Sequence, residues 1–211
     1  MNKLIYIIIC LFFSTNNILG QENTAKKILD SLSIKSKSYN DIYAKFNFNY
    51  YNSSQEIDES SEGEIWIKDD MYKLNMGKDL SIINNGDVLW YFMKDVPEVQ
   101  IMENDPKDEM NPSNIFTIYE KGYEYKYIGQ KKIDNIDVYQ LELFPKKNNS
   151  IEKFTLFISK KYELKSIRLH DTDGGVTSYS IRKFRTNTNI SDSKFIFRKK
   201  DFPDVEVIDL R

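Results

Sequence analysis

The residue types that most often carry catalysis or bind metals are scarce in this chain. Its 211 residues include one histidine, His170, and one cysteine, Cys10. Most zinc sites, and most pairs of a nucleophile and a base, use these two residue types. Asp171 follows His170, but successive strand residues point to opposite faces, so Asp171 is badly placed to orient the imidazole. We therefore expect a solvated strand histidine, with no catalytic role and no metal site.

The remaining motifs also favour simple structural interpretations. Asp171-Thr172-Asp173-Gly174 resembles half of a calcium loop, but a strand pattern follows where further oxygen ligands are needed, which predicts a hairpin turn. The chain has no Gly-rich phosphate loop and no Gly-x-Ser-x-Gly elbow. These observations predict a protein that is not an enzyme and that uses no cofactor.

Charge and composition exclude one class of partner and point to apolar surface. Thirty basic and 32 acidic residues give a net charge of −2, which offers no electrostatic reason to bind nucleic acid. In contrast, the chain contains 13 Phe, 14 Tyr and 2 Trp. Such a sequence is rich in ring-bearing apolar surface and poor in reactive groups.

The first 20 residues have the layout of a secretory signal peptide. A positive start with Lys3 precedes the uncharged apolar run from Leu4 to Phe13, and Gly20 is a small residue at the cleavage site. The run is shorter than the roughly 20 residues of a membrane-spanning helix, although an uncleaved anchor is the alternative. Cys10 lies within the run without a preceding small residue, which argues against lipid attachment. We expect export, cleavage near Gly20, and a single domain over residues 21–211.

Hydrophobic periodicity predicts a mainly β protein with α elements. Apolar residues at helical spacing predict a short helix of about three turns from Ala25 to Leu32. From Ile42 to Tyr50 the period changes to two, which is typical of a half-buried strand, and Ser53 to Glu62 is expected to form a turn. Further strands are predicted over residues 63–68, 71–76, 80–83, 88–93, 99–102, 123–127, 138–144, 154–159, 164–170, 176–184, 195–197 and 205–210.

One segment in the middle of the chain breaks the strand pattern. Asn111-Pro112-Ser113-Asn114 is typical of a helix start, and Gly122 can end the helix. Its apolar residues are Ile115, Phe116, Ile118 and Tyr119. So short a helix is unstable alone and must pack on other elements. The sequence therefore predicts about ten antiparallel strands, an N-terminal helix and an inserted helix.

At this point the sequence resembles the outer-membrane lipoprotein carrier family, LolA. The resemblance is carried by the order and spacing of several segments across the mature chain: Gly63–Lys68, Ile82–Phe92, Asn111–Ser113, Lys153–Leu156, Ser178–Ile181, Lys194–Phe197 and Val205–Asp209. It implies an unclosed antiparallel β-barrel of ten to eleven strands, whose apolar concave face is covered by a helical lid. It also implies a periplasmic carrier that shelters the acyl chains of lipoproteins.

The resemblance further implies site residues and partners. The expected barrel-side contacts are Trp66, Tyr72, Leu74, Met76, Trp90 and Phe92, although either tryptophan could serve the structural core instead. The expected lid residues are Ile115, Phe116 and Tyr119. The expected partners are lipoprotein acyl chains, an inner-membrane lipoprotein-releasing transporter and a transient outer-membrane acceptor, with the carrier itself a monomer.

The sequence departs from the best-known family members at one position. In those members, the residue directly after the lysine that matches Lys68 is an arginine, and this arginine forms hydrogen bonds to the lid. Here that residue is Asp69, which cannot reproduce the donors of a guanidinium group. Any latch must therefore use other residues. Two alternatives to lipoprotein transport stay open: a carrier of another lipid or lipid-linked pigment, and an envelope sensor or interaction domain on the same scaffold.

Overall fold

The computed structural model describes residues 15–93, 96–105, 112, 116, 118–120, 122–147, 150–201 and 203–211, with the backbone alone for residues 15–21 and 118. Its helical elements are α2 (Thr15–Lys37) and the 3₁₀ helices η2 (Ile118–Glu120), η3 (Asp192–Phe195) and η4 (Lys199–Asp201). Its strands are β1 (Ile42–Asn52), β2 (Ile57–Lys68), β3 (Met71–Met76), β4 (Leu80–Asn84), β5 (Val88–Met93), β6 (Glu98–Glu103), β7 (Tyr123–Ile133), β8 (Ile136–Pro145), β9 (Ile151–Ser159), β10 (Leu164–Asp171), β11 (Val176–Thr186) and β12 (Glu206–Asp209).

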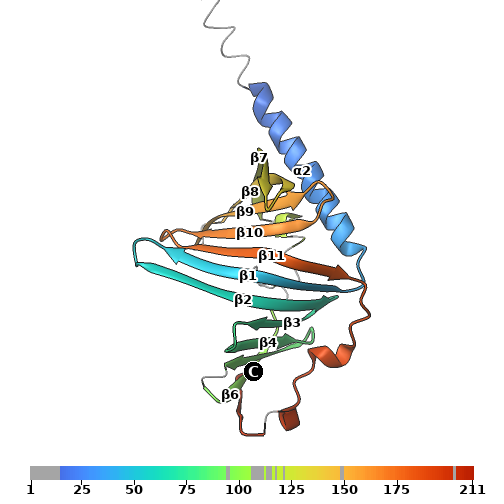
Figure 1. Ribbon diagram of the computed structural model, residues 1–211, viewed down its shortest axis with the longest axis vertical. Helices are drawn as coiled ribbons and strands as arrows, with labels where there is room; N and C mark the ends of the chain where they lie inside the picture. Colours follow the sequence, from blue (N-terminus) through green and yellow to red (C-terminus); the bar gives the residue numbers. More distant parts are fainter. Residues whose placement is uncertain are drawn as a thin grey trace, which may run out of the picture.

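The twelve strands form one sheet in the order β12-β6-β5-β4-β3-β2-β1-β11-β10-β9-β8-β7 (Figure 1). Neighbouring strands are antiparallel, except that β12 runs parallel to β6. The edge strands β12 and β7 do not pair with each other, so the sheet does not close. The prediction of an unclosed, mainly β architecture is confirmed.

Helix α2 packs on one face of the sheet, next to β7. It buries Ala25, Ile28, Leu29 and Leu32 in the same apolar core as the side chains of β8 and β9. We call this the inner face of the sheet and the opposite one the outer face. The predicted apolar positions are therefore the buried ones, although the helix is 23 residues long rather than three turns.

Two segments differ from the sequence prediction. β2 begins at Ile57, so the predicted turn from Ser53 to Glu62 is too long. The Asn49 amide bonds to Asp58, Glu59 and Ser60, and these bonds hold a polar stretch as a strand. The predicted strand Phe195–Phe197 is also wrong. Phe195 instead ends the 3₁₀ helix η3, which Ser191 caps, and its side chain is fully buried.

The described part of the chain contains no helix that is long and apolar enough to cross a membrane. Across the same residues, His, Cys, Asp and Glu side chains form no group of three or more that could hold a metal ion.

Candidate functional site: an apolar cavity under the inserted segment

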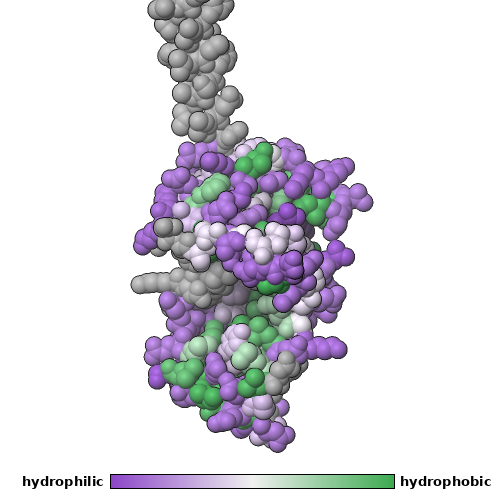
Figure 2. Space-filling model, turned by 90° about the vertical axis from the view of Figure 1, so that its left-hand side faces the viewer, coloured by the Kyte–Doolittle hydropathy of each residue, from purple (hydrophilic) through white to green (hydrophobic). Residues whose placement is uncertain are grey.

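The inner face contains a cavity of about 200 Å³ whose lining is almost entirely apolar. The lining residues are Ile42, Ala44, Phe46, Ile65, Ile67, Leu74, Pro112, Phe116, Phe154, Leu164, Ile167, Leu169, Tyr179, Ile181 and Phe184. They come from β1, β2, β3, β9, β10 and β11, together with the segment between β6 and β7. In Figure 2, hydrophobic side chains gather in the lower half of the molecule and are framed by hydrophilic ones.

Strand alternation and register bring these side chains together. Ile42, Ala44 and Phe46 are two residues apart on β1 and therefore share a face. Ala44 lies opposite Ile65 on β2, and Ile65 lies opposite Leu74 on β3. Cross-strand partners point to the same side of a sheet, so the apolar rows of successive strands form one continuous wall.

One glycine makes room for an aromatic ring in this wall. Phe46 lies opposite Gly63, and a Cβ on Gly63 would lie 2.3 Å from Cζ of the Phe46 ring. The ring therefore occupies the space where a side chain would be. This close approach explains a glycine inside a long strand.

Phe116 and Tyr119, from the segment between β6 and β7, are both buried in the inner core. Phe116 lines the cavity, whereas the Tyr119 hydroxyl donates to Asp30 Oδ1 of α2 at 3.2 Å. Burial, together with the nearby carboxylates of Asp30 and Glu120, raises the pKa of Tyr119 to about 12, so the hydroxyl stays protonated as a donor. The hydrogen bond from Tyr119 to Asp30 thus attaches η2 to α2.

Glu120 provides a second attachment of η2 to α2. Its Oε1 accepts hydrogen bonds from Ser33 Oγ at 3.1 Å and from Lys37 Nζ at 2.7 Å. Together with Tyr119 and Asp30, these residues join the end of the inserted segment to the helix that covers the core. Helix α2 therefore anchors the inserted segment, which covers the cavity at Phe116 and is called the cover below.

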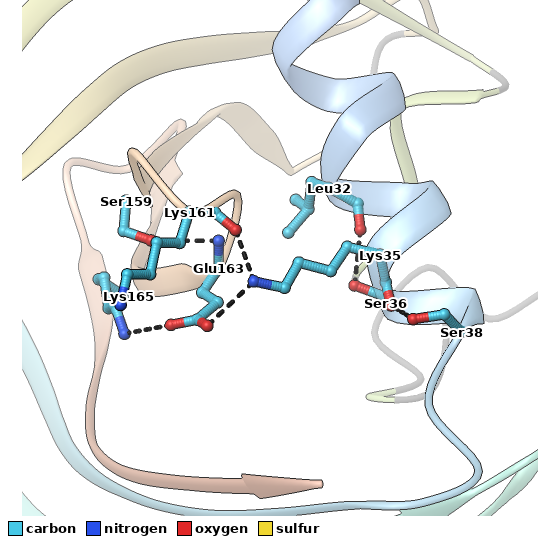
Figure 3. Close-up of polar contacts among 8 residues, drawn as sticks. All are labelled: Leu32, Lys35, Ser36, Ser38, Ser159, Lys161, Glu163 and Lys165. Carbon is cyan, nitrogen blue, oxygen red and sulfur yellow. Dashed lines mark hydrogen bonds and ion pairs between the residues drawn. The ribbon is translucent and has the colours of Figure 1, made fainter.

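The other side of α2 is attached to the β9–β10 hairpin (Figure 3). Lys35 Nζ donates to the Lys161 carbonyl at 2.6 Å and to Glu163 Oε1 at 3.0 Å, and Lys165 Nζ donates to Glu163 Oε2 at 2.9 Å. Burial alone would raise the pKa of Glu163, but the hydrogen bonds from Lys165 and Lys35 outweigh it and hold the pKa below its usual value. The carboxylate is therefore charged at neutral pH and connects helix to hairpin.

The structure brings part of the predicted site together. Leu74 and Phe116 line the cavity. Tyr72 and Tyr119 are buried in the same core, and Met76 is half-buried against it. Ile115 lies outside the described residues. The segment is described at Pro112, Phe116 and η2, so the predicted continuous helix stays a prediction.

Trp66, Trp90 and Phe92 lie on the outer face, which corrects their predicted place. Neighbours of Trp66 on β2, Ile65 and Ile67, line the cavity, and alternation therefore turns Trp66 away from it. Around Trp90 and Phe92 the outer face is apolar because the residues that follow β11 cover it, and we call these residues the C-terminal segment. Trp90 stacks on Phe197 at 6.5 Å between ring centroids, and Phe92 packs with Val99 and Val205.

Sequence reasoning missed most of the cavity wall, namely the residues of β1, β9, β10 and β11. Their signal was present as the alternation of Ile42, Ala44 and Phe46, and as the apolar positions of β10. The sequence pattern did not show that β1 pairs with β11. This pairing places the apolar side chains of β10 and β11 on the same wall as those of β1, β2 and β3.

The two sites doubted from sequence have structural roles. His170 Nε2 lies 3.1 Å from Thr155 Oγ1, and burial, followed by the charge of Lys153, lowers the pKa of His170. Asp171 N donates to the carbonyl of Gly175 at 2.9 Å, and Gly175 N donates to Asp173 Oδ1, as in the predicted hairpin turn.

Asp69 is exposed in the β2–β3 turn, with a positive φ of 52°. The hydrogen bonds that reach η2 come instead from α2, through Asp30, Ser33 and Lys37. Within the described residues, then, the hydrogen bonds that hold η2 do not use the position where the best-known relatives have arginine.

An unclosed antiparallel sheet, covered by a helix and an inserted segment over an apolar cavity, defines a scaffold for binding. The family model for the outer membrane lipoprotein carrier protein LolA matches residues 37–198, so the chain belongs to the LolA family. No curated protein matches the chain.

Solved structures that are similar to this chain have low sequence identity to it. An uncharacterized conserved protein from Thermus thermophilus superposes with a TM-score of 0.60 at 10% identity, covering 87% of this chain and 98% of that one. A LolA superfamily protein from Nitrosomonas europaea gives a TM-score of 0.43 at 12% identity, covering 82% and 97%. MucB, in the Pseudomonas aeruginosa MucA/MucB complex, gives a TM-score of 0.44 at 12% identity, covering 82% of this chain and 61% of that one.

Proposed function

We propose that this protein is a periplasmic carrier that shelters the acyl chains of lipoproteins and transfers them from the inner to the outer membrane. The observation that carries the proposal is the cavity between the inner face and Phe116, because its lining is almost entirely apolar. Each CH₂ group removed from water contributes about 0.8 kcal/mol, so such a wall favours hydrocarbon over any polar ligand.

The size of the cavity requires movement during binding. Its volume of about 200 Å³ is small. Small-molecule sites usually have volumes of about 300–1,000 Å³, and a lipoprotein carries long acyl chains. Acyl chains therefore enter only if the cover is displaced, and the bonds of η2 to α2 are the contacts that resist it.

The proposed route across the periplasm requires a donor and an acceptor. A signal peptide over residues 1–20 would deliver the chain to that compartment, and residues 21–211 would form the carrier. A lipoprotein-releasing transporter of the inner membrane would supply the cargo, and an outer-membrane acceptor would take it from a monomeric carrier. No step in this route needs catalysis or a cofactor.

Native mass spectrometry of the protein purified from the periplasm tests this function. We expect a bound triacylated lipoprotein, and depletion of the carrier should leave lipoproteins in the inner membrane. Recovery of lipid without protein would instead support a carrier of another lipid. Normal lipoprotein sorting after depletion would overturn the proposal and favour a sensor or interaction domain.

A further inference from the structure

The outer face carries a second hollow, of about 520 Å³, between the sheet and the C-terminal segment. It is lined by Trp66, Lys73, Ile83, Ile190, Ser191, Ser193, Lys194, Ile196, Arg198 and Asp201. It lies on the side of β2, β3 and β4 opposite the apolar cavity, since Trp66, Lys73 and Ile83 are cross-strand neighbours there. The two sites are therefore separated by the sheet.

Positive charge exceeds negative charge in this hollow. Three cationic side chains, Lys73, Lys194 and Arg198, face one carboxylate, Asp201. Arg198 Nε donates to that carboxylate at 2.8 Å, so the single anion is already engaged. Lys194 Nζ lies 3.9 Å from the centroid of the Trp66 ring, a contact that orients the ammonium without neutralising it.

Lys73 is the residue that the fold leaves unsatisfied. It is half-buried between Trp66 and Ile83, and among the described residues its ammonium forms no hydrogen bond or salt bridge. Burial lowers the pKa of Lys73, and the nearby charges of Lys194 and Arg198 lower it further, although Glu64 acts in the opposite sense. A partly buried charge without a partner is unfavourable, so an anion here would stabilise the protein.

The walls of the hollow are held in place independently of any ligand. Asp41, which is 3% exposed, accepts hydrogen bonds from Thr188 N at 2.8 Å and from Ile190 N at 3.1 Å. Lys68 Nζ pairs with Asp192 Oδ1 at 2.5 Å. These contacts fix the C-terminal segment against the sheet. The cationic side chains are therefore held close together before any ligand binds.

We propose that this hollow binds a negatively charged phosphate group. Lysine and arginine are the usual phosphate-binding side chains, and Ser191 and Ser193, whose hydroxyls bond to each other, add an uncharged donor to the lining. The volume accommodates a phosphate ester rather than the ion alone. Such a group reaches the hollow either on a soluble ester or on the headgroup of an anionic phospholipid.

Isothermal titration calorimetry of the full chain at physiological salt tests the site with inorganic phosphate and with glycerol 3-phosphate. Co-sedimentation with phosphatidylglycerol vesicles, compared with phosphatidylcholine vesicles, tests the membrane source. Lys73→Gln should weaken binding about tenfold or more, because a charge-assisted hydrogen bond is lost. The matched control is Lys183→Gln, an exposed lysine outside the hollow, which should leave binding unchanged.

Binding of the soluble ester that Lys73→Gln weakens supports the proposal with a soluble source. Binding of the anionic vesicles alone, again weakened by Lys73→Gln, supports it with a headgroup source. Thermal unfolding of Lys73→Gln should show unchanged or increased stability, since an unpaired, partly buried charge has been removed. Lys194→Gln is a second variant, which should also weaken binding of the phosphate probe. Absence of binding in both assays, or equal binding by Lys73→Gln and Lys183→Gln, would overturn the proposal.

Discussion

At the scale of single residues, the wall of the apolar cavity depends on how Phe46 and Gly63 fit together. The Phe46 ring lies over Gly63, and the Asn75 carbonyl lies 3.0 Å from where a Cβ would be. Phe46 lines the apolar cavity and also borders a separate polar hollow that contains Lys45 and Asn47. A side chain at Gly63 therefore changes the wall itself.

Gly63→Ala is expected to lower the free energy of unfolding by about 1–3 kcal/mol, the usual cost of overpacking. Urea denaturation measures this change. The control is Ser61→Ala two residues earlier on β2, which should stay within about 0.5 kcal/mol of the parent protein. A Gly63→Ala variant as stable as the parent would show that the ring moves without cost.

Neighbouring residues on β11 separate the two faces of the sheet. Ile181 lines the apolar cavity, whereas Arg182 is exposed on the opposite face. Ile181→Gln should weaken binding of a fluorescent fatty-acyl probe by about tenfold or more, because a polar amide replaces apolar wall. Arg182→Gln should bind the probe like the parent protein. Equal affinities of the two variants would contradict the assignment of the cavity.

At the scale of elements, α2 is held from two sides, by η2 and by the β9–β10 hairpin. The hairpin contact depends on a charged Glu163 between Lys35 and Lys165. Because the pKa of Glu163 is lowered in the folded state, its stabilisation is complete above the ordinary glutamate pKa of about 4.3. That stabilisation disappears as the pH falls through the lowered pKa.

Glu163→Gln should therefore cost about 1 kcal/mol at pH 7, after allowance for partial exposure of the pair. The difference from the parent protein should shrink as the pH falls below the ordinary glutamate pKa and through the lowered pKa of the folded state, because Glu163 then becomes protonated in both states. Urea denaturation at several pH values measures it, with the exposed Glu124→Gln as the control. A difference independent of pH would show that Glu163 contributes through packing rather than charge.

The contact between η2 and α2 makes a kinetic prediction. Tyr119→Phe removes the hydrogen bond to Asp30 and should lower stability by about 1 kcal/mol. Under the proposed function it should also speed uptake of the acyl probe, because the cover opens more readily. Stopped-flow fluorescence measures the rate, and Tyr162→Phe on the β9–β10 turn is the control. An unchanged rate would show that this bond does not hold the cover.

Periodicity predicted the elements better than their ends. Residues 42–50 alternate clearly because one side of the strand is buried, and that strand is present. The strand over residues 164–170 is also present, although a register shift after Leu164 interrupts its alternation. The polar start of β2 carries no such signal, since cross-strand bonds of Asn49 rather than burial hold it. Phe195 was assigned to a strand because its apolar neighbours suggest one, yet the bonds from Asp41 to residues 188 and 190 direct the segment across the outer face.

At the scale of the whole molecule, the sheet separates an apolar inner site from a cationic outer one. An alternating strand does not show which of its faces meets the ligand when both faces are covered. The family resemblance predicts inward contacts for Trp66 and Trp90, although either could serve the structural core. On the outer face, Trp90 stacks on Phe197 and the Lys194 ammonium lies over the Trp66 ring, both from the C-terminal segment. The partnership of β1 and β11 that completes the cavity joins residues far apart in the chain, and local patterns do not contain it.

The central claim is that acyl chains lie between the inner face and Phe116. Photocrosslinking with a fatty-acyl diazirine probe, followed by peptide mapping by mass spectrometry, tests it most directly. We expect label on cavity residues such as Leu74, Phe116 and Ile181, and loss of that label in Ile181→Gln but not in Arg182→Gln. Label confined to the outer face around Trp66 and Trp90, or none above background, would contradict the account.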